Sequence, residues 1–333
     1  MPTLHDVAKE AGVSITTVSR VINGTYVDKV SDKTRKRVLQ IAREMNYQPN
    51  IAARALRNKS TFQIGLVVSN IDLSFTASIV EGVQEIAMAS NYSCLLYITR
   101  GHLELERNSF RALARKKVDG IIWVPDQHQS IDPTRYVYDI PMVQLLTKRV
   151  DGISSVLVDQ EKGANMATKH LLSLGHTSIL HLRSDGVHGL QRCQGYLQAM
   201  SEAHVDTPMV VPYEGGFDGS FVAVKELLES GAQPTAIMAA TDMAAWGAIK
   251  AANEMMLRVP EDISISGYDD IVVARYISPP LTTIAQPKRL LGRVAMQQLM
   301  HCIERGDEST KDTIIEPELV ERASTASVTR SVR

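Results

Sequence analysis

Several side chains on one short predicted helix, residues 15–22, have the chemistry that contacts with DNA bases require. Arg20 carries a planar guanidinium that can donate two hydrogen bonds to one guanine. Thr16 can hydrogen-bond to a base or a phosphate, and Ile15 can pack on a thymine methyl group. Ser19 lies on the same helix. A lone surface arginine is usually just solvated, so these residues predict a DNA contact only if neighbouring elements present them together.

The charge of the chain is divided unevenly. Residues 1–60 contain eleven basic and five acidic residues, a formal charge of +6. The remaining residues contain 25 basic and 32 acidic residues, a formal charge of −7. A basic head on an acidic body indicates that the head binds a polyanion, although charge alone is weak evidence.

The elements around Arg20 predict a helix-turn-helix. Thr3 and Asp6 have the spacing of a capping box before a first helix, and Gly12 suits the left-handed residue that ends it. Ser14 is a good N-cap for the helix 15–22. Two short helices joined by a glycine-containing turn form the DNA-binding motif, whose second helix enters the major groove. A third helix starts near residue 31 or 32, and its expected core residues are Val38, Ile41, Ala42 and Met45.

After residue 60 the hydrophobic pattern changes to short apolar runs alternating with amphipathic segments. This pattern is typical of βαβ units and parallel sheets, and there are enough units for two doubly wound halves. A ligand would then bind in the cleft beyond the carboxyl ends of the strands. The strands are expected at 62–68, 94–99, 120–124, 142–146, 155–159, 179–183, 209–213, 236–240 and 263–268. The helices are expected at 75–90, 104–116, 160–174, 188–203, 218–230 and 242–256.

The order of residues along the whole chain resembles the lactose/galactose repressor (LacI/GalR) family of transcriptional regulators. The head carries this resemblance in residues 3–14 and 17–23, and the hinge of that family is matched by 46–50 and 52–56. The body carries it in residues 258–264 and 267–270, then in 280–284 and 286–287.

The resemblance implies both a fold and a domain organisation. The expected fold is an all-α helix-turn-helix head plus an α/β body of two doubly wound parallel-sheet subdomains, like a periplasmic sugar-binding protein. The expected boundaries are 1–47 for the DNA-binding domain, 48–60 for the hinge helix and linker, and 61–333 for the effector-binding and dimerisation domain. Within the body, an N-subdomain of about 61–159 and 288–316 joins a C-subdomain of about 160–287 and 317–328 through three crossovers.

The resemblance also implies which residues contact DNA. Residues 48–57 would form a hinge helix that orders on its operator, and a pair of Leu56 side chains from a dimer would wedge into the minor groove. Arg54 and Arg57 would lie near phosphates. A linker leucine packed on the body is the alternative for Leu56. The DNA-binding positions are Thr3, Ser14, Ile15, Thr16, Thr17, Ser19, Arg20, Asn23, Tyr47, Asn50, Ala53, Arg54 and Leu56.

Four positions match effector-binding residues of that family, Phe75, Arg192, Phe217 and Asp269, and Thr241 occupies a fifth effector-binding position. The resemblance implies an aromatic face from Phe75 and Phe217, a cation from Arg192 and a carboxylate from Asp269 that accepts ligand hydroxyls. The alternative is that Arg192 and Asp269 pair with each other across the cleft.

The chain departs from the family at four positions expected in the cleft. Thr241 stands where the family usually has asparagine, and Leu146 stands where it has an aspartate. Val124 and Thr76 replace a polar residue and a second aromatic. These losses favour an effector with fewer hydroxyls, or of a different shape, than a plain monosaccharide.

We therefore predict a transcriptional regulator, most simply a repressor, whose operator affinity is controlled by a sugar or sugar derivative. The expected partners are pseudo-palindromic operator DNA, that effector and a second copy of the chain. No enzyme motif of the Gly-x-Ser-x-Gly, Walker or HExxH type occurs, so no catalytic residue, cofactor or metal is expected. The sequence has no signal peptide and no membrane span, which predicts a cytoplasmic protein. The alternative function is a solute-binding protein without a transcriptional role, which leaves the basic head unexplained.

Overall fold

The structure, a computed structural model of the chain, describes residues 2–23, 29–47, 60–71, 75–147, 150–306 and 310–328. Its internal contacts divide the chain into two units, Met1–Phe62 and Gln63–Arg333. We call these units the head and the body and describe each by itself.

Three helices form the described part of the head: α1 (Leu4–Ala11), α2 (Ile15–Asn23) and α3 (Asp32–Glu44). The predicted capping box is present, because the Asp6 amide donates to the Thr3 hydroxyl at 3.3 Å and the Thr3 amide donates to the Asp6 carboxylate at 2.8 Å. Gly12 ends α1 with φ of 61°, as its lack of a side chain permits. The three helices enclose a small apolar core of Val7, Ala8, Ala11, Val18 and Val38.

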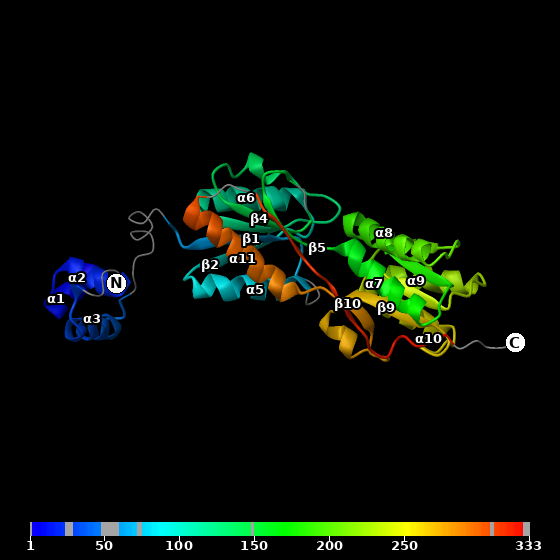
Figure 1. The fold of residues 1–333 in the computed structure, drawn as a ribbon. Coiled ribbons are helices and arrows are strands. Elements are labelled where there is room, and N and C mark those ends of the chain that lie inside the picture. The colour runs from blue at the N-terminus through cyan, green and yellow to red at the C-terminus, as the bar shows by residue number, and fades with distance from the viewer. Residues whose placement is uncertain are drawn as a thin grey trace. The chain divides into compact units, whose positions relative to one another are not determined.

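The first sheet of the body is entirely parallel, with the strand order β11-β5-β4-β3-β1-β2. Helices α5 and α11 cover one face, where they pack side by side on a shared core, and α6 packs on the other (Figure 1). The strands are β1 (Gln63–Val68), β2 (Ser93–Ile98), β3 (Gly120–Val124), β4 (Met142–Leu146), β5 (Ser154–Val158) and β11 (Asp312–Ile315). The helices are α5 (Phe75–Ala89), α6 (Leu103–Lys116), the short η2 (Pro133–Arg135) and α11 (Lys288–Arg305). We call this part of the body the first subdomain.

The second sheet has the order β12-β10-β9-β8-β6-β7 and is parallel except for the edge strand β12. Helices α7 and α8 pack on one face of it and α9 and α10 on the other. The strands are β6 (Ile179–Ser184), β7 (Met209–Tyr213), β8 (Ala236–Ala239), β9 (Ser264–Asp269), β10 (Thr282–Ala285) and β12 (Glu318–Val320). The helices are α7 (Gln160–Ser173), α8 (Gly186–Glu202), α9 (Gly216–Glu229), α10 (Asp242–Glu254) and the short η3 (Val272–Arg275). We call this part the second subdomain.

The chain passes between the two subdomains three times. The connections run from β5 to α7, from β10 to α11 and from β11 to β12. The predicted fold class, a helix-turn-helix head with two doubly wound halves, is confirmed. Within the described ranges, none of the helices combines the length and the apolar character that crossing a bilayer requires.

Candidate functional site

The N-terminal half of α2 presents polar and apolar side chains on the outside of the head. Ile15 is 46% exposed, although it is a large apolar residue, and Thr16 is also exposed. Val18 is fully buried beneath them and fixes the helix on the head core. Arg20 lies half-buried one turn further on. An exposed isoleucine beside a threonine on such a helix can contact base edges in the major groove.

Other predicted DNA-contacting residues also stabilise the helices of the head. The Ser14 hydroxyl accepts a hydrogen bond from the Thr17 amide at 3.1 Å and so caps α2, and Thr3 caps α1. Ser19 is buried, with 8% of its surface exposed. Tyr47 packs on the head core, and burial raises the pKa of its hydroxyl.

The remaining predicted DNA contacts are Asn23 and four hinge residues. Asn23 is the last residue of α2. The predicted hinge residues, Asn50, Ala53, Arg54 and Leu56, lie outside the described residues.

In the body, a cavity of about 660 Å³ opens at the carboxyl ends of the parallel strands of both sheets. All five predicted effector positions, Phe75, Arg192, Phe217, Thr241 and Asp269, line this cavity. The four positions at which the chain departs from the family pattern, Thr76, Val124, Leu146 and Thr241, also line it. Strand ends in doubly wound folds are where ligands bind, because the loops that follow them are free to vary.

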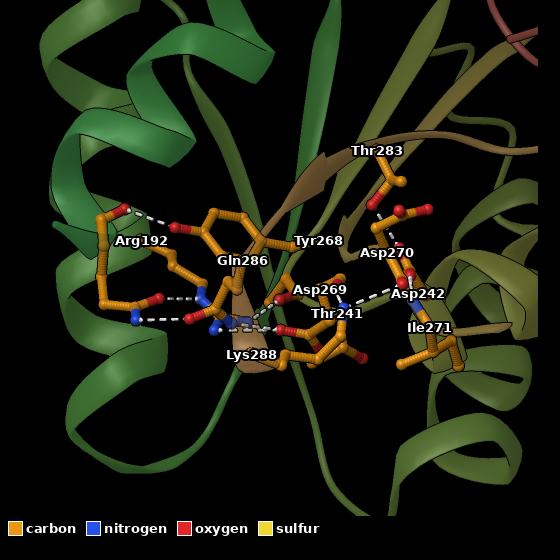
Figure 2. Close-up of polar contacts among 12 residues, drawn as sticks. Arg192, Thr241, Asp242, Tyr268, Asp269, Asp270, Ile271, Thr283, Gln286 and Lys288 are labelled. Carbon is orange, nitrogen blue, oxygen red and sulfur yellow. Dashed lines mark hydrogen bonds and ion pairs between the residues drawn. The ribbon is translucent and has the colours of Figure 1, made fainter. Parts of the chain in front are cut away.

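Arg192 is held rigidly in the wall of this cavity. Its Nε donates to the Gln160 side chain at 2.9 Å, one Nη donates to the Ala240 carbonyl, and the other lies 3.4 Å from Asp269 Oδ1. Its guanidinium also stacks over the ring of Tyr268, 3.8 Å from the centroid (Figure 2). The side chain is 5% exposed, so the charge is buried together with its partners.

The pairing of Arg192 with Asp269, considered as an alternative to ligand binding, is thus present in the structure. The two residues do not pair across the cleft, however, because α8 and β9 both belong to the second subdomain. The pair lines the cavity as a unit and can contact a ligand together.

Asp269 has one carboxylate oxygen engaged and one available. Its Oδ1 accepts hydrogen bonds from Gln286 at 2.6 Å and from Arg192 (Figure 2). Among the described residues, none donates to Oδ2. Burial raises the pKa of Asp269, although Arg192, Gln286 and Lys288 oppose that shift. An oxygen without a donor inside a cavity is suited to accept a ligand hydroxyl.

The backbone at Asp269 is strained. Asp269 has φ of 113° and Asp270 has φ of 49°, and Leu146 on the opposite sheet has φ of 69°. Residues other than glycine rarely adopt these angles, and such strain concentrates at ligand sites where the surrounding structure enforces it. Asp269 and Leu146 each end a strand at the cavity.

Two aromatic side chains line the cavity on different sides. Phe75 begins α5 on one side, and Phe217 lies in the first turn of α9 on the other. Phe217 is fixed by an edge-on contact with Trp246, with ring centroids 5.3 Å apart. Such rings can pack on the apolar face of a sugar or another flat ligand.

Sequence analysis missed three residues that support this site: Gln160, Gln286 and Lys288. Gln286 lines the cavity and holds Asp269, Gln160 holds Arg192, and Lys288 donates to the carbonyl oxygens of Asp269 and Asp270. Gln160 comes directly after the predicted strand 155–159, so a polar residue after a buried strand was an available signal there. Gln286 and Lys288 follow β10, which was not predicted.

Asp242 also belongs to the support of the site. It is buried and accepts hydrogen bonds from the Thr283 hydroxyl and from the Ile271 amide at 2.7 Å (Figure 2). Burial raises its pKa well above the ordinary value, and the negative charge of Asp269 adds to the rise. The Ile271 bond fixes the loop that follows β9, and with it the backbone next to Asp269.

A helix-turn-helix unit joined to a two-lobed ligand-binding body defines a class of proteins, the ligand-responsive DNA-binding regulators. Residues 3–50 match the family described as bacterial regulatory proteins, lacI family, and residues 168–325 match the periplasmic binding protein-like domain. The ribose operon repressor of Haemophilus influenzae is 33% identical over 97% of this chain and 98% of its own length. The transcriptional regulator DegA of Bacillus subtilis is 38% identical over 97% of this chain and 98% of its own.

Solved structures agree with these relatives. The lac repressor dimer bound to operator and the anti-inducer ONPF superposes with a TM-score of 0.85 at 30% identity, covering 98% of this chain and 99% of that one. The regulator CelR in complex with cellobiose has a TM-score of 0.72 at 31% identity, covering 97% and 100%. This chain belongs to the lacI family of bacterial regulatory proteins and is a DNA-binding repressor. Its partners, as in that family, are operator DNA, a small-molecule effector and a second copy of the chain.

Proposed function

We propose that the body cavity binds an uncharged sugar or sugar derivative, and that this binding changes the affinity of the head for its operator. The observation that carries the proposal is the pair of Asp269 and Arg192 in the cavity wall, with Asp269 Oδ2 available to a ligand. A carboxylate beside a fixed cation and an aromatic ring is a combination that suits a polyol.

The charges around the cavity support an uncharged ligand. Four carboxylates line it, from Asp126, Asp185, Glu214 and Asp269. Among the described residues that line it, Arg192 is the one arginine or lysine, and three of its five N–H groups already donate within the protein. A phosphate or carboxylate ligand would therefore meet a net negative surface with few free donors.

Two regulators of similar structure were solved with uncharged sugars. CelR is in complex with cellobiose, and a LacI-family regulator from Enterococcus faecium, 27% identical with a TM-score of 0.72, has bound ribose. The apolar replacements in this cavity, Val124 and Leu146, favour a ligand that presents fewer hydroxyls at those positions.

The proposed mechanism is a shift between two arrangements of the subdomains. A ligand that contacts both lobes favours the arrangement in which it makes more contacts, and it shifts the equilibrium by its difference in affinity for the two. Operator binding must then change ligand affinity by the same factor. On the DNA side, we propose base contacts from Ile15, Thr16 and Arg20 of α2, together with the hinge residues predicted above.

A thermal-shift screen tests the ligand class. Neutral sugars, sugar phosphates and nucleobases are compared at equal concentration, and a neutral sugar at about 100 times its Kd should stabilise the protein by about 2.7 kcal/mol. Asp269→Ala should abolish that shift while operator binding is retained. If the largest shifts come from sugar phosphates, the proposed ligand class is wrong. If Asp269→Ala keeps full sugar affinity, Asp269 does not belong to the site.

A further inference from the structure

Four side chains at the cavity close a ring of hydrogen bonds. Arg192 Nε donates to Gln160 Oε1 at 2.9 Å, and Gln160 Nε2 donates to Gln286 Oε1 at 3.1 Å. Gln286 Nε2 donates to Asp269 Oδ1 at 2.6 Å, and Arg192 Nη2 lies 3.4 Å from the same oxygen. Both amide side chains are thus oriented at both ends, by a donor on one side and an acceptor on the other.

The ring joins the cavity wall to the connections between the subdomains. Gln160 is the first residue of α7, directly after the passage from β5. Gln286 lies between β10 and α11, in the second passage. These two residues are 126 positions apart in sequence, and each is almost completely buried. Two of the three connections therefore contact each other and the Arg192–Asp269 pair through side chains alone.

Lys288 adds a second link from the same connection. It is the first residue of α11, and its ammonium donates to the carbonyl oxygens of Asp269 and Asp270, the latter at 2.9 Å. Both of these residues have positive φ, and their strained backbone needs support from outside the strand. Figure 2 shows Lys288 and Gln286 converging on Asp269 from this segment. The same ammonium lies 5.7 Å from the ring centroid of Phe75 on the first subdomain.

Buried amides always need partners, so satisfaction of hydrogen bonds alone is the simplest reason for such contacts. Gln144 provides the comparison. It is fully buried, and it donates to the Val150 carbonyl at 3.1 Å and to the Ser155 hydroxyl at 3.0 Å, all within the first subdomain. Gln160 and Gln286 differ because their partners lie on separate connections and on the ligand-facing pair.

We propose that Gln160, Gln286 and Lys288 are positioning residues that couple Asp269 to the subdomain connections, so that a ligand bound at Asp269 alters the arrangement of the two lobes. The proposal rests on the proposed effector function. Any rotation of one lobe on the other moves the passages that contain residues 160 and 286–288, and the ring and the Lys288 bonds transmit that movement to the Asp269 carboxylate and backbone. Removing them leaves the ligand its contacts with Phe75 and Asp269 Oδ2 but weakens their connection to the lobes.

The first test measures the ring without a ligand, by hydrogen–deuterium exchange of the full-length protein. Gln160→Ala should speed amide exchange in peptides covering residues 268–272 and 284–290 by about five- to tenfold, the factor that one lost hydrogen bond gives. These peptides are remote from residue 160 in sequence. Gln144→Ala, the matched loss of a buried amide, should leave both peptides unchanged. Equal amide exchange rates in these two peptides for wild type and Gln160→Ala would show that the ring of hydrogen bonds does not join Gln160 to these segments, which would overturn the proposal.

The second test measures coupling, with D-ribose and cellobiose as probes at saturating concentration. The ratio of operator Kd with and without sugar should move towards one in Gln160→Ala and Lys288→Met. The control Arg289→Met removes a neighbouring exposed cation that pairs with Glu85, and should keep the wild-type ratio. A purely structural role would lower stability but leave the ratio unchanged at saturation, which would overturn the proposal. If neither sugar changes the operator Kd of the wild type, these sugars are not effectors and the proposed function loses support. The exchange experiment uses no sugar, so it still tests whether the ring joins Asp269 to the subdomain connections.

Discussion

At the scale of single residues, burial controls the protonation of the groups behind the cavity. Asp269 and Asp242 both have raised pKa values, and Lys288 has a lowered one, because burial disfavours the charged form of each. Their charges oppose these shifts where opposite signs meet, as between Lys288 and Asp269. The grouping of opposite charges in the site therefore partly offsets the effect of burial on these pKa values.

His181 in β6 allows this effect of burial to be measured. It is completely buried and stacked on Tyr196 at 5.1 Å, and its Nδ1 lies 3.0 Å from the Met238 carbonyl, so that nitrogen must carry the proton. Among the described residues, its Nε2 has no hydrogen-bond partner. Burial lowers the pKa of His181 from 6.5 to about 4.

We predict that His181 makes the body less stable as the pH falls from 6.5 towards 4. In that window the unfolded chain binds a proton on His181 and the folded chain does not, so up to about 3 kcal/mol of stability is lost. The measurement is urea unfolding across this window for wild type and His181→Gln, which cannot titrate. As the pH falls from 6.5 towards 4, the free energy of unfolding of wild type should decrease relative to that of His181→Gln. If the two proteins keep the same difference throughout, the pKa of His181 is not depressed.

At the scale of elements, the close crossing of α5 and α11 positions one side of the cavity. A Cβ added to Gly82 would lie 2.1 Å from the Arg289 carbonyl oxygen, and one added to Gly292 would lie 2.1 Å from the Ile79 carbonyl oxygen. Both distances are far shorter than a van der Waals contact between a Cβ and a backbone oxygen, so glycine is required at both positions. Because α5 carries Phe75 and α11 carries Lys288, the crossing sets the distance between these two side chains.

Gly82→Ala tests whether this crossing is as tight as the distances indicate. In an unhindered helix the change would stabilise by about 1 kcal/mol, because alanine favours helix more than glycine does. Here the added methyl must push α11 away, so we predict a loss of about 1–3 kcal/mol and weaker sugar binding. The control Gln84→Ala, at an exposed position of α5, should stay within about 0.5 kcal/mol of wild type. A gain in stability for Gly82→Ala would contradict the account.

Local patterns predicted most of these elements, and contacts distant in sequence were not predictable. The capping box at Thr3, the left-handed Gly12 and the Ser14 cap of α2 follow from short-range chemistry, and all three are present. The nine predicted strands agree with the structure to within one residue at each end, because buried parallel strands are continuous apolar runs. Strands β10, β11 and β12 and helix α11 were not located from the apolar pattern. The contact of Gln160 with Gln286 depends on how two distant connections meet, and no periodicity encodes that meeting.

Only part of the candidate site was predictable, because some of its contacts join residues distant in sequence. Phe75, Arg192 and Asp269 could be placed from motifs that the chain shares with a family. The predicted C-subdomain, about 160–287, already contained both Arg192 and Asp269, but their direct contact depends on how α8 and β9 meet, which sequence patterns leave open. Gln160 could have been suspected from its place after a predicted strand. The strand before Gln286 and Lys288 was not predicted, and the partners of all three residues depend on contacts distant in sequence.

At the scale of the whole molecule, a basic DNA-binding head is joined to a body whose ligand cavity lies at the strand ends of two sheets. The head has its own core and the body has its own, so each can keep its fold while the other changes state. The body controls the head only if ligand and operator each discriminate between the arrangements of the dimer. If they favour different arrangements, the ligand weakens operator binding, and if they favour the same one, it strengthens it; the effect is equal in both directions.

The most direct test of this account is operator binding measured by fluorescence anisotropy, with and without a neutral sugar that calorimetry shows to bind the body. We predict that saturating sugar changes the operator Kd of the wild-type dimer at least about fivefold, the lower end of ordinary allosteric coupling. Asp269→Ala should bind operator as the sugar-free wild type does and should not respond to sugar. An operator Kd that stays the same at saturating sugar would contradict the claim that the cavity controls the head.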